Sequence, residues 1–219
     1  MRKALAIGLL SLVAACSGND PGTDTIIPES GAESPGAAVE GLRSTLAAGD
    51  FESAGSLAVP DQAALASLAE GASFGQVADA ISDGDAEIAA NFWSGFAQGV
   101  GEVLTGDLAI EERGSVTEGG VEFFLVGVTP ESGTERLIIT RDAEGQRIDL
   151  FASFGAGLAQ RMISPVEILL GTSSEDSGVI LGALREVVPS LLVASTDPNL
   201  SPEAVQGVLQ LIELITRVG

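Results

Sequence analysis

The period of the hydrophobic pattern changes twice along the chain, and this limits the fold more than any other feature of the sequence. Runs rich in β-branched and aromatic residues fill the stretch 105–154, and short Gly- and Pro-containing turn signals separate them. Short connections join antiparallel neighbours, so the pattern predicts a four-stranded meander. The predicted strands are residues 108–117, 121–129, 134–141 and 146–153.

Helical periodicity flanks the predicted sheet on both sides, over residues 37–104 and 155–219. In the first section Ser34, Asp50 and Asp61 are placed to cap helices that begin after them. Further along that section, Ile88, Phe92, Phe96 and Val100 recur at every fourth position and predict an apolar helix from Asp85 to about Leu104.

The section after the sheet carries its own helix signals. The segments 164–167 and 172–175 both fit the capping box, in which a Ser or Thr and a following acid satisfy free backbone donors. Pro189 is expected to end or kink the second of these helices. Ser201 followed by proline is expected to open the last one.

The strand predicted at 121–129 is apolar on both faces. Alternation places Phe123 and Leu125 on one face and Phe124, Val126 and Val128 on the other. Helices are therefore expected to cover both sides of the sheet. The whole pattern predicts one α+β domain over residues 37–219, with N-terminal helices, the meander and C-terminal helices.

The first 15 residues have the layout of a secretory signal, with Arg2 and Lys3 before an apolar run too short to span a bilayer. The run ends Val13-Ala14-Ala15-Cys16, which resembles the lipobox of bacterial lipoproteins. The resemblance implies that Cys16 receives a diacylglycerol anchor and acyl chains such as palmitate, and becomes the new N-terminus. The alternative is an ordinary signal peptide with an incidental cysteine, although Cys16 is the only cysteine of the chain.

Residues 16–36 follow the signal and are rich in Gly, Pro, Ser and acids. This composition predicts a disordered acidic tether. The expected product is an envelope lipoprotein held on the extracytoplasmic or periplasm-facing side of a membrane by its lipid.

Charge and residue types exclude several classes of function. Taking Arg2 and Lys3 from the 10 basic residues leaves 8 against 31 acidic ones, a net charge of −23 for the mature chain. Such a surface repels nucleic acid, so no nucleic-acid partner is expected. The mature chain would contain no His, Lys or Tyr and no free thiol, which excludes Ser-His-Asp, Cys-His and Schiff-base chemistry. No enzyme activity, metal or cofactor is expected.

Three short motifs suggest chemistry but fit helix starts better. Residues 71–75 match G-x-S-x-G without any histidine to act as the base, so Ser73 is expected to cap a helix. Residues 176–178 match the aspartic-protease triplet only once and also suit a helix start. Residues 83–87 resemble the opening of a calcium loop but lack its later Gly and Glu, and Asp85 is expected to be a cap.

An aromatic group is the one candidate for lining an apolar cavity, although a Phe stripe at helical spacing is more often solid core. Its members are Phe92, Trp93, Phe96, Phe123, Phe124 and Phe151. If Trp93 is buried, its indole N–H needs an acceptor.

The segment from Val39 to Pro60, with its AAGDFESAGSL core, resembles the first helices of cystatin-like α+β domains of the nuclear transport factor 2 superfamily. The resemblance extends over residues 37–154 and implies a curved sheet around a pocket. The chain departs from that family in the roughly 65 residues that follow the sheet. The expected function is binding of an apolar or amphiphilic small molecule, with a membrane-tethered interaction module for an envelope protein partner as the alternative.

Overall fold

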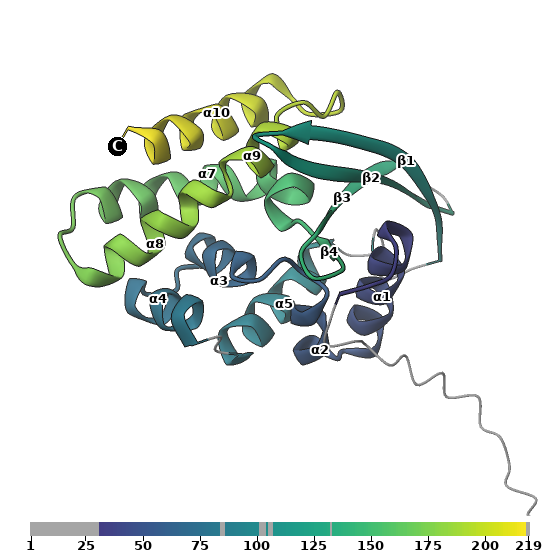
Figure 1. Cartoon of the computed structure of the whole chain (residues 1–219), viewed down its shortest axis with the longest axis horizontal. Helices are drawn as coiled ribbons and strands as arrows, with labels where there is room; N and C mark the ends of the chain where they lie inside the picture. Colours follow the sequence, from purple (N-terminus) through teal and green to yellow (C-terminus); the bar gives the residue numbers. More distant parts are fainter. Residues whose placement is uncertain (1–30, 84–85, 101–103, 105–106, 132, 218–219) are drawn as a thin grey trace, which may run out of the picture.

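The structure, a computed structural model, describes residues 31–83, 86–100, 104, 107–131 and 133–217. It has the predicted α+β architecture, with helices, then a four-stranded antiparallel sheet, then helices (Figure 1). The elements before the sheet are α1 (Pro35–Ala48), α2 (Phe51–Ser56), α3 (Gln62–Ala66), the 3-10 helix η1 (Ser67–Glu70), α4 (Phe74–Asp83) and α5 (Ala86–Val100).

The predicted caps set the first helices. Ser34 Oγ accepts the N–H of Ala37 at 3.2 Å, and Gly49 ends α1 in the left-handed region at φ 71°. Asp50 then caps α2 by accepting from the Ser53 N–H at 3.2 Å. Asp61 precedes α3 as predicted, but it makes no side-chain capping bond and has φ 67°.

The sheet has the predicted order β1-β2-β3-β4, with every neighbouring pair antiparallel. Its strands are β1 (Leu108–Glu118), β2 (Val121–Pro130), β3 (Arg136–Asp142) and β4 (Gln146–Ile148). The register of β1 shifts between Glu112 and Gly114, so Arg113 lies in a bulge. The turn at Gly119 lies against Pro189, so the hairpin of β1 and β2 reaches the helices after the sheet (Figure 1).

The prediction for the last strand was wrong at its end. β4 stops at Ile148, and residues 150–153 form the first turn of a helix instead of strand. The cause is Asp149, whose buried carboxylate accepts the N–H of Ala152 at 2.9 Å and so begins the helix.

The helices after the sheet are α7 (Leu150–Leu170), α8 (Glu175–Glu186), α9 (Val188–Ala194) and α10 (Pro202–Thr216). The helix start predicted at Ser164 was wrong, because α7 continues through Pro165. Met162, Val166 and Leu169 on either side of Pro165 are fully buried. Their packing holds the helix together despite the hydrogen bond that proline cannot make.

The remaining C-terminal boundaries lie close to the predicted ones. Ser174, two residues after the predicted Thr172, caps α8 by accepting from the Ser177 N–H at 3.2 Å. Pro189 lies in the first turn of α9, and α8 and α9 are bent by 46°. Ser201 caps α10 as predicted. Within the described residues no single helix is long and apolar enough to cross a membrane, and only the bent pair α8–α9 passes by length and composition.

The folded part begins before the predicted tether boundary at residue 36. Ala32 pairs with Gln146 in an antiparallel bridge, with both N–H···O distances 2.8 Å. Gly31 lies so close to Gly145 that a Cβ on Gly31 would be 2.8 Å from the Gly145 carbonyl carbon. This backbone contact places Gly31 and Ala32 along the edge of β4, so residues 31–36 belong to the domain.

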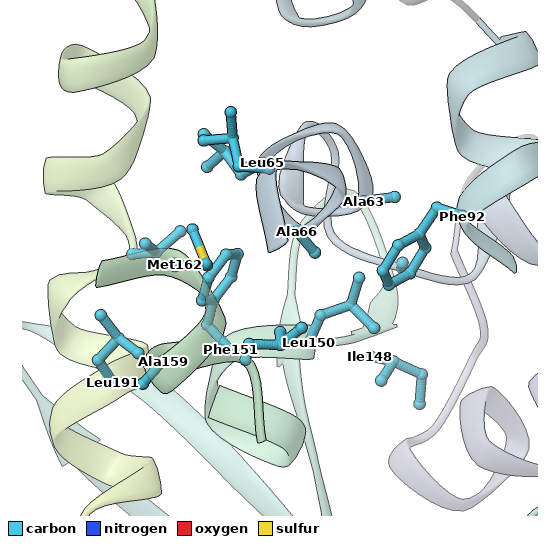
Figure 2. Packing of buried hydrophobic residues seen from close by; sticks show 14 of the residues in the cluster. Ala63, Leu65, Ala66, Phe92, Ile148, Leu150, Phe151, Ala159, Met162 and Leu191 are labelled. Carbon is cyan, nitrogen blue, oxygen red and sulfur yellow. The ribbon is translucent and has the colours of Figure 1, made fainter. Parts of the chain in front are cut away.

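Most of the apolar interior forms one cluster between the helices and the first face of the sheet, meaning the face that carries Val126, Val128, Ile138 and Ile148. Helix α1 packs across all four strands on this side. Figure 2 shows side chains from α3, α5, α7, α9 and β4 converging in this cluster. The second face carries a separate, smaller cluster made of Phe123, Ile139, Ala152 and Val193.

Candidate functional site

An apolar groove lies on the second face of the sheet, between β1–β3 and the ends of α7 and α9. Its volume is about 220 Å³. The lining residues come from three strands, two helices and the loop before α10: Val116, Leu125, Leu137, Ile139, Ala152, Ser153, Ala156, Val193, Ala194, Thr196, Asp197, Pro198 and Leu200.

The sheet contributes an aliphatic floor. Leu125 and Ile139 are Cα partners in the ladder between β2 and β3, and Leu137 lies two residues before Ile139 on the same face. Ile139 is buried, whereas Leu125 and Leu137 are half-buried. Val116 on β1 is 40% exposed, which is unusual for a valine in a strand and marks the open side of the groove.

The helices contribute small side chains to the opposite wall. Ala152 and Ala156 lie one turn apart on α7, and Ala194 ends α9. Gly155 of α7 lies against Leu191 and Ala194, where an added Cβ would be 3.2 Å from each side chain. Short side chains on both helices leave open the space that larger ones would fill.

A buried polar network holds α7 and α9 in place beside the groove. The Asp149 carboxylate is fully buried and accepts the hydroxyl of Ser190 at 2.8 Å as well as the Ala152 N–H. Arg141 of β3 brings its Nε to 3.2 Å from Asp149 Oδ2, at an angle that does not make a hydrogen bond. One carboxylate therefore connects a strand and two helices.

The hydroxyl groups that line the groove are occupied by the backbone. Ser153 Oγ accepts the N–H of Ile139 at 2.8 Å and donates to the carbonyl of the same residue at 3.1 Å. Thr196 donates to the carbonyl of Val193 at 2.7 Å. The side chain of Asp197 accepts the Asn199 N–H at 2.8 Å through Oδ1. Among the lining side chains described, Oδ2 of Asp197 has no hydrogen-bond partner, and the Thr196 hydroxyl, which only donates, can still accept from a ligand.

The aromatic group predicted for a cavity lies mainly in the solid core. The rings of Phe92, Trp93 and Phe96 contact one another with centroids 5.0–5.6 Å apart, and Phe96 also meets Phe154 of α7 at 4.9 Å. Trp93 is fully buried, and its Nε1 has no hydrogen-bond partner among the described residues.

The other three aromatic residues are spread over both faces. Phe151 is fully buried in the main cluster near Met162 (Figure 2). Phe123 belongs to the small cluster beside the groove, and Phe124 points to the first face by alternation. None of the six aromatic residues lines the groove. The alternation of Leu125, Leu137 and Ile139 marks an aliphatic strip of the sheet in the sequence, but no sequence signal places the alanines of α7 and α9 opposite it.

The short motifs are helix starts where the structure describes them. Ser73 Oγ accepts the Gln76 N–H at 3.4 Å, and Gln76 Oε1 accepts the Ser73 N–H at 3.2 Å, which is a capping box. Residues 176–178 lie in the first turn of α8. Asp85 and part of the 83–87 motif lie outside the described residues. Within the described part of the chain, no three acidic side chains are grouped as metal ligands would be.

Comparison of the chain with protein families, with curated proteins and with solved structures finds no match. The resemblance to cystatin-like domains therefore stays a prediction. Cys16 and the lipobox lie outside the described residues, and the assignment of a lipid anchor stays a prediction as well.

Proposed function

We propose that the chain is an envelope lipoprotein, anchored through lipid on Cys16, whose domain binds the aliphatic part of a small apolar or amphiphilic molecule. The groove on the second face of the sheet carries this proposal. Its floor is aliphatic, it is open to solvent on one side, and three of its thirteen lining side chains are polar; a mostly apolar lining with a few polar groups is common in small-molecule sites.

The size of the groove limits the ligand. Its volume of about 220 Å³ is below the roughly 300–1,000 Å³ typical of pockets for drug-sized ligands. A whole phospholipid does not fit, whereas a short aliphatic chain does. Burial of such a chain contributes about 0.8 kcal/mol per methylene, so binding strength is expected to rise with chain length until the groove is full.

A non-catalytic role agrees with the residue types at the groove. The lining residues offer a carboxylate and two hydroxyl groups, and the hydroxyls already bond to backbone. Proton transfer or nucleophilic attack needs an activated partner for such a hydroxyl, and the chain has no histidine to supply it.

A second candidate is a membrane-tethered interaction module, favoured by the position of β1. This strand is 11 residues long and lies at the edge of the sheet, where β2 is its one pairing partner among the described strands. Such an edge can add a strand from a partner, with the groove beside it accepting a partner's aliphatic side chain.

Filling the groove tests the binding proposal. Ala156→Leu adds an aliphatic side chain inside the groove, whereas Ala47→Leu adds the same side chain on the exposed face of α1. Titration calorimetry with octanol should show binding to the unsubstituted protein and to Ala47→Leu, and weakened binding to Ala156→Leu. Equal binding to all three proteins would place the ligand elsewhere, and absence of binding would overturn the proposal.

The lipid anchor has a separate test. Cells expressing the full chain are grown with radiolabelled palmitate, and the protein is compared with Cys16→Ser. The label should enter the unsubstituted protein only. Release of an unlabelled, soluble mature chain by both proteins would show an ordinary signal peptide.

A further inference from the structure

The apolar groove ends at a charged surface on the same face of the sheet. Gly127 follows Leu125 on this face and is the Cα partner of Leu137, so it adjoins two residues of the groove floor. The side chains of Glu135 and Arg113 lie over Gly127, where an added Cβ would be 3.1 Å from Arg113 Nε. The lack of a side chain at residue 127 makes room for these charges beside the groove.

The bulge in β1 brings an uneven set of charges to this position. Arg113 lies in the bulge, and its guanidinium is 2.9 Å from Glu111 Oε1 and 2.5 Å from Glu135 Oε1. Two carboxylates thus share one positive charge, and one negative charge remains in excess.

The opposite wall adds another negative charge. Asp197 lines the groove, is half-buried, and has Oδ2 free of partners among the described residues. None of the lining residues is basic. Arg141 lies on the same face of β3, but the fully buried carboxylate of Asp149 balances its charge at 3.2 Å. An aliphatic floor bordered by excess negative charge is complementary to an amphiphile with an aliphatic chain and a positively charged head group.

We infer that the groove binds an aliphatic chain that ends in a cationic group, such as a primary or quaternary ammonium. This inference rests on the proposed function. The chain occupies the space between Leu125, Leu137 and the alanines of α7 and α9. The ammonium then lies at the charged border of the groove, where either Asp197 or the Glu111–Arg113–Glu135 cluster supplies unbalanced carboxylate charge.

The same charges disfavour anionic amphiphiles. A carboxylate or phosphate at the charged border of the groove would be partly desolvated beside carboxylate charge, and no lining residue is a base that could pair with it. Because the groups at the groove end are partly solvated, we expect the preference to be moderate. An ammonium should bind about tenfold more tightly than a carboxylate on the same chain, and this ratio should fall at high salt.

Three matched ligands test the inference: octylamine, octanol and octanoate, which are cationic, neutral and anionic at neutral pH. Each is titrated by calorimetry into the mature chain from residue 16 with Cys16→Ser, so that no attached lipid competes. The expected order of affinity is octylamine, then octanol, then octanoate. Octanol binding with octanoate equal to or tighter than octylamine would overturn the inference and leave the proposed function standing. Absence of binding by all three would overturn both.

Charge-neutral variants locate the preference. Asp197→Asn and Glu135→Gln should each reduce the ratio of octylamine to octanoate affinity about two- to fourfold. Glu213→Gln on α10, another exposed glutamate in an ion pair, is the matched control and should keep the ratio of the unsubstituted protein. Equal changes in all three variants would mean that overall charge sets the preference, which would overturn the assignment to this groove.

Discussion

The two faces of the sheet differ in how helices cover them. On the first face, α1 crosses all four strands, and Val126, Val128 and Ile148 are completely buried. On the second face, the start of α7 and the short α9 cover Phe123 and Ile139, while Leu125 and Leu137 stay half-buried. One sheet thus has a face that is fully covered and a face that leaves a groove.

The difference comes from the side chains that the helices present. α1 brings Val39, Leu42 and Leu46 to the first face, whereas the wall of the groove is made of Ala152, Ala156 and other small residues. Close packing is worth several kcal/mol per large side chain, so a face covered by alanines is less stable. We therefore expect substitutions on the two faces to have unequal costs.

The largest effect is expected at Asp149, the residue that holds α7 and α9 against the second face. Asp149→Ala removes the acceptor for Ala152 N–H and Ser190, and leaves the charge of Arg141 unbalanced. Breaking a buried pair costs about 3–5 kcal/mol. Chemical denaturation should show a loss of this size in the free energy of unfolding.

Ser190→Ala is the graded control for this network, because it removes one hydrogen bond and should cost about 1 kcal/mol. If Asp149→Ala costs no more than Ser190→Ala, the carboxylate is not what holds the second face together.

The next effect compares neighbouring residues that point to opposite faces. Ile138 is 1% exposed on the first face, and Leu137 is half-buried at the groove. Ile138→Ala should cost about 2–5 kcal/mol through lost burial and a cavity, whereas Leu137→Ala should cost about 1 kcal/mol or less. Urea denaturation of both variants measures the difference, and equal costs would show that the second face is packed as firmly as the first.

Alternation along the strands was enough to predict the two faces of the sheet, and the short turn signals between strands predicted the meander. Phe123 and Leu125 lie on one face of the sheet and Val126 and Val128 on the other, because successive side chains of a strand point to opposite faces. The groove was not predictable in this way. Its residues are separated along the chain by up to 84 positions, from Val116 to Leu200, and only the folded chain brings them together.

Local signals misled where tertiary packing decided the outcome. Ser164-Pro165 fits a helix start, yet buried Met162 and Val166 keep α7 continuous through it. Residues 150–153 contain apolar and aromatic residues suited to a strand, yet the Asp149 cap turns them into helix. The large aromatic residues around Trp93 were the predicted lining of a cavity, but they pack in the core. The groove depends on small residues, which give no strong local signal.

The smallest effect is expected at Asp61, at the start of α3 behind the first face. Burial raises the pKa of Asp61 above its ordinary value, and the negative charge of Glu186 raises it further. The charged form is therefore less favourable in the folded protein than in the unfolded one. As a result, Asp61 favours the folded state most when it is protonated, at pH values below its unfolded pKa of about 3.9. This contribution to the free energy of unfolding is lost as the pH rises through the raised pKa of the folded protein.

Asp61→Asn removes this charge and keeps a residue that tolerates the left-handed backbone at φ 67°. We expect a gain of about 0.5 kcal/mol near neutral pH, kept small because the side chain is exposed to solvent. The gain should disappear below about pH 3. Denaturation at both pH values measures it, with Asp79→Asn on α4 as the same substitution at another exposed acid. Because Asp61 is not among the residues that line the groove, the substitution should leave octanol binding unchanged, which separates helix-start electrostatics from the contrast between the faces.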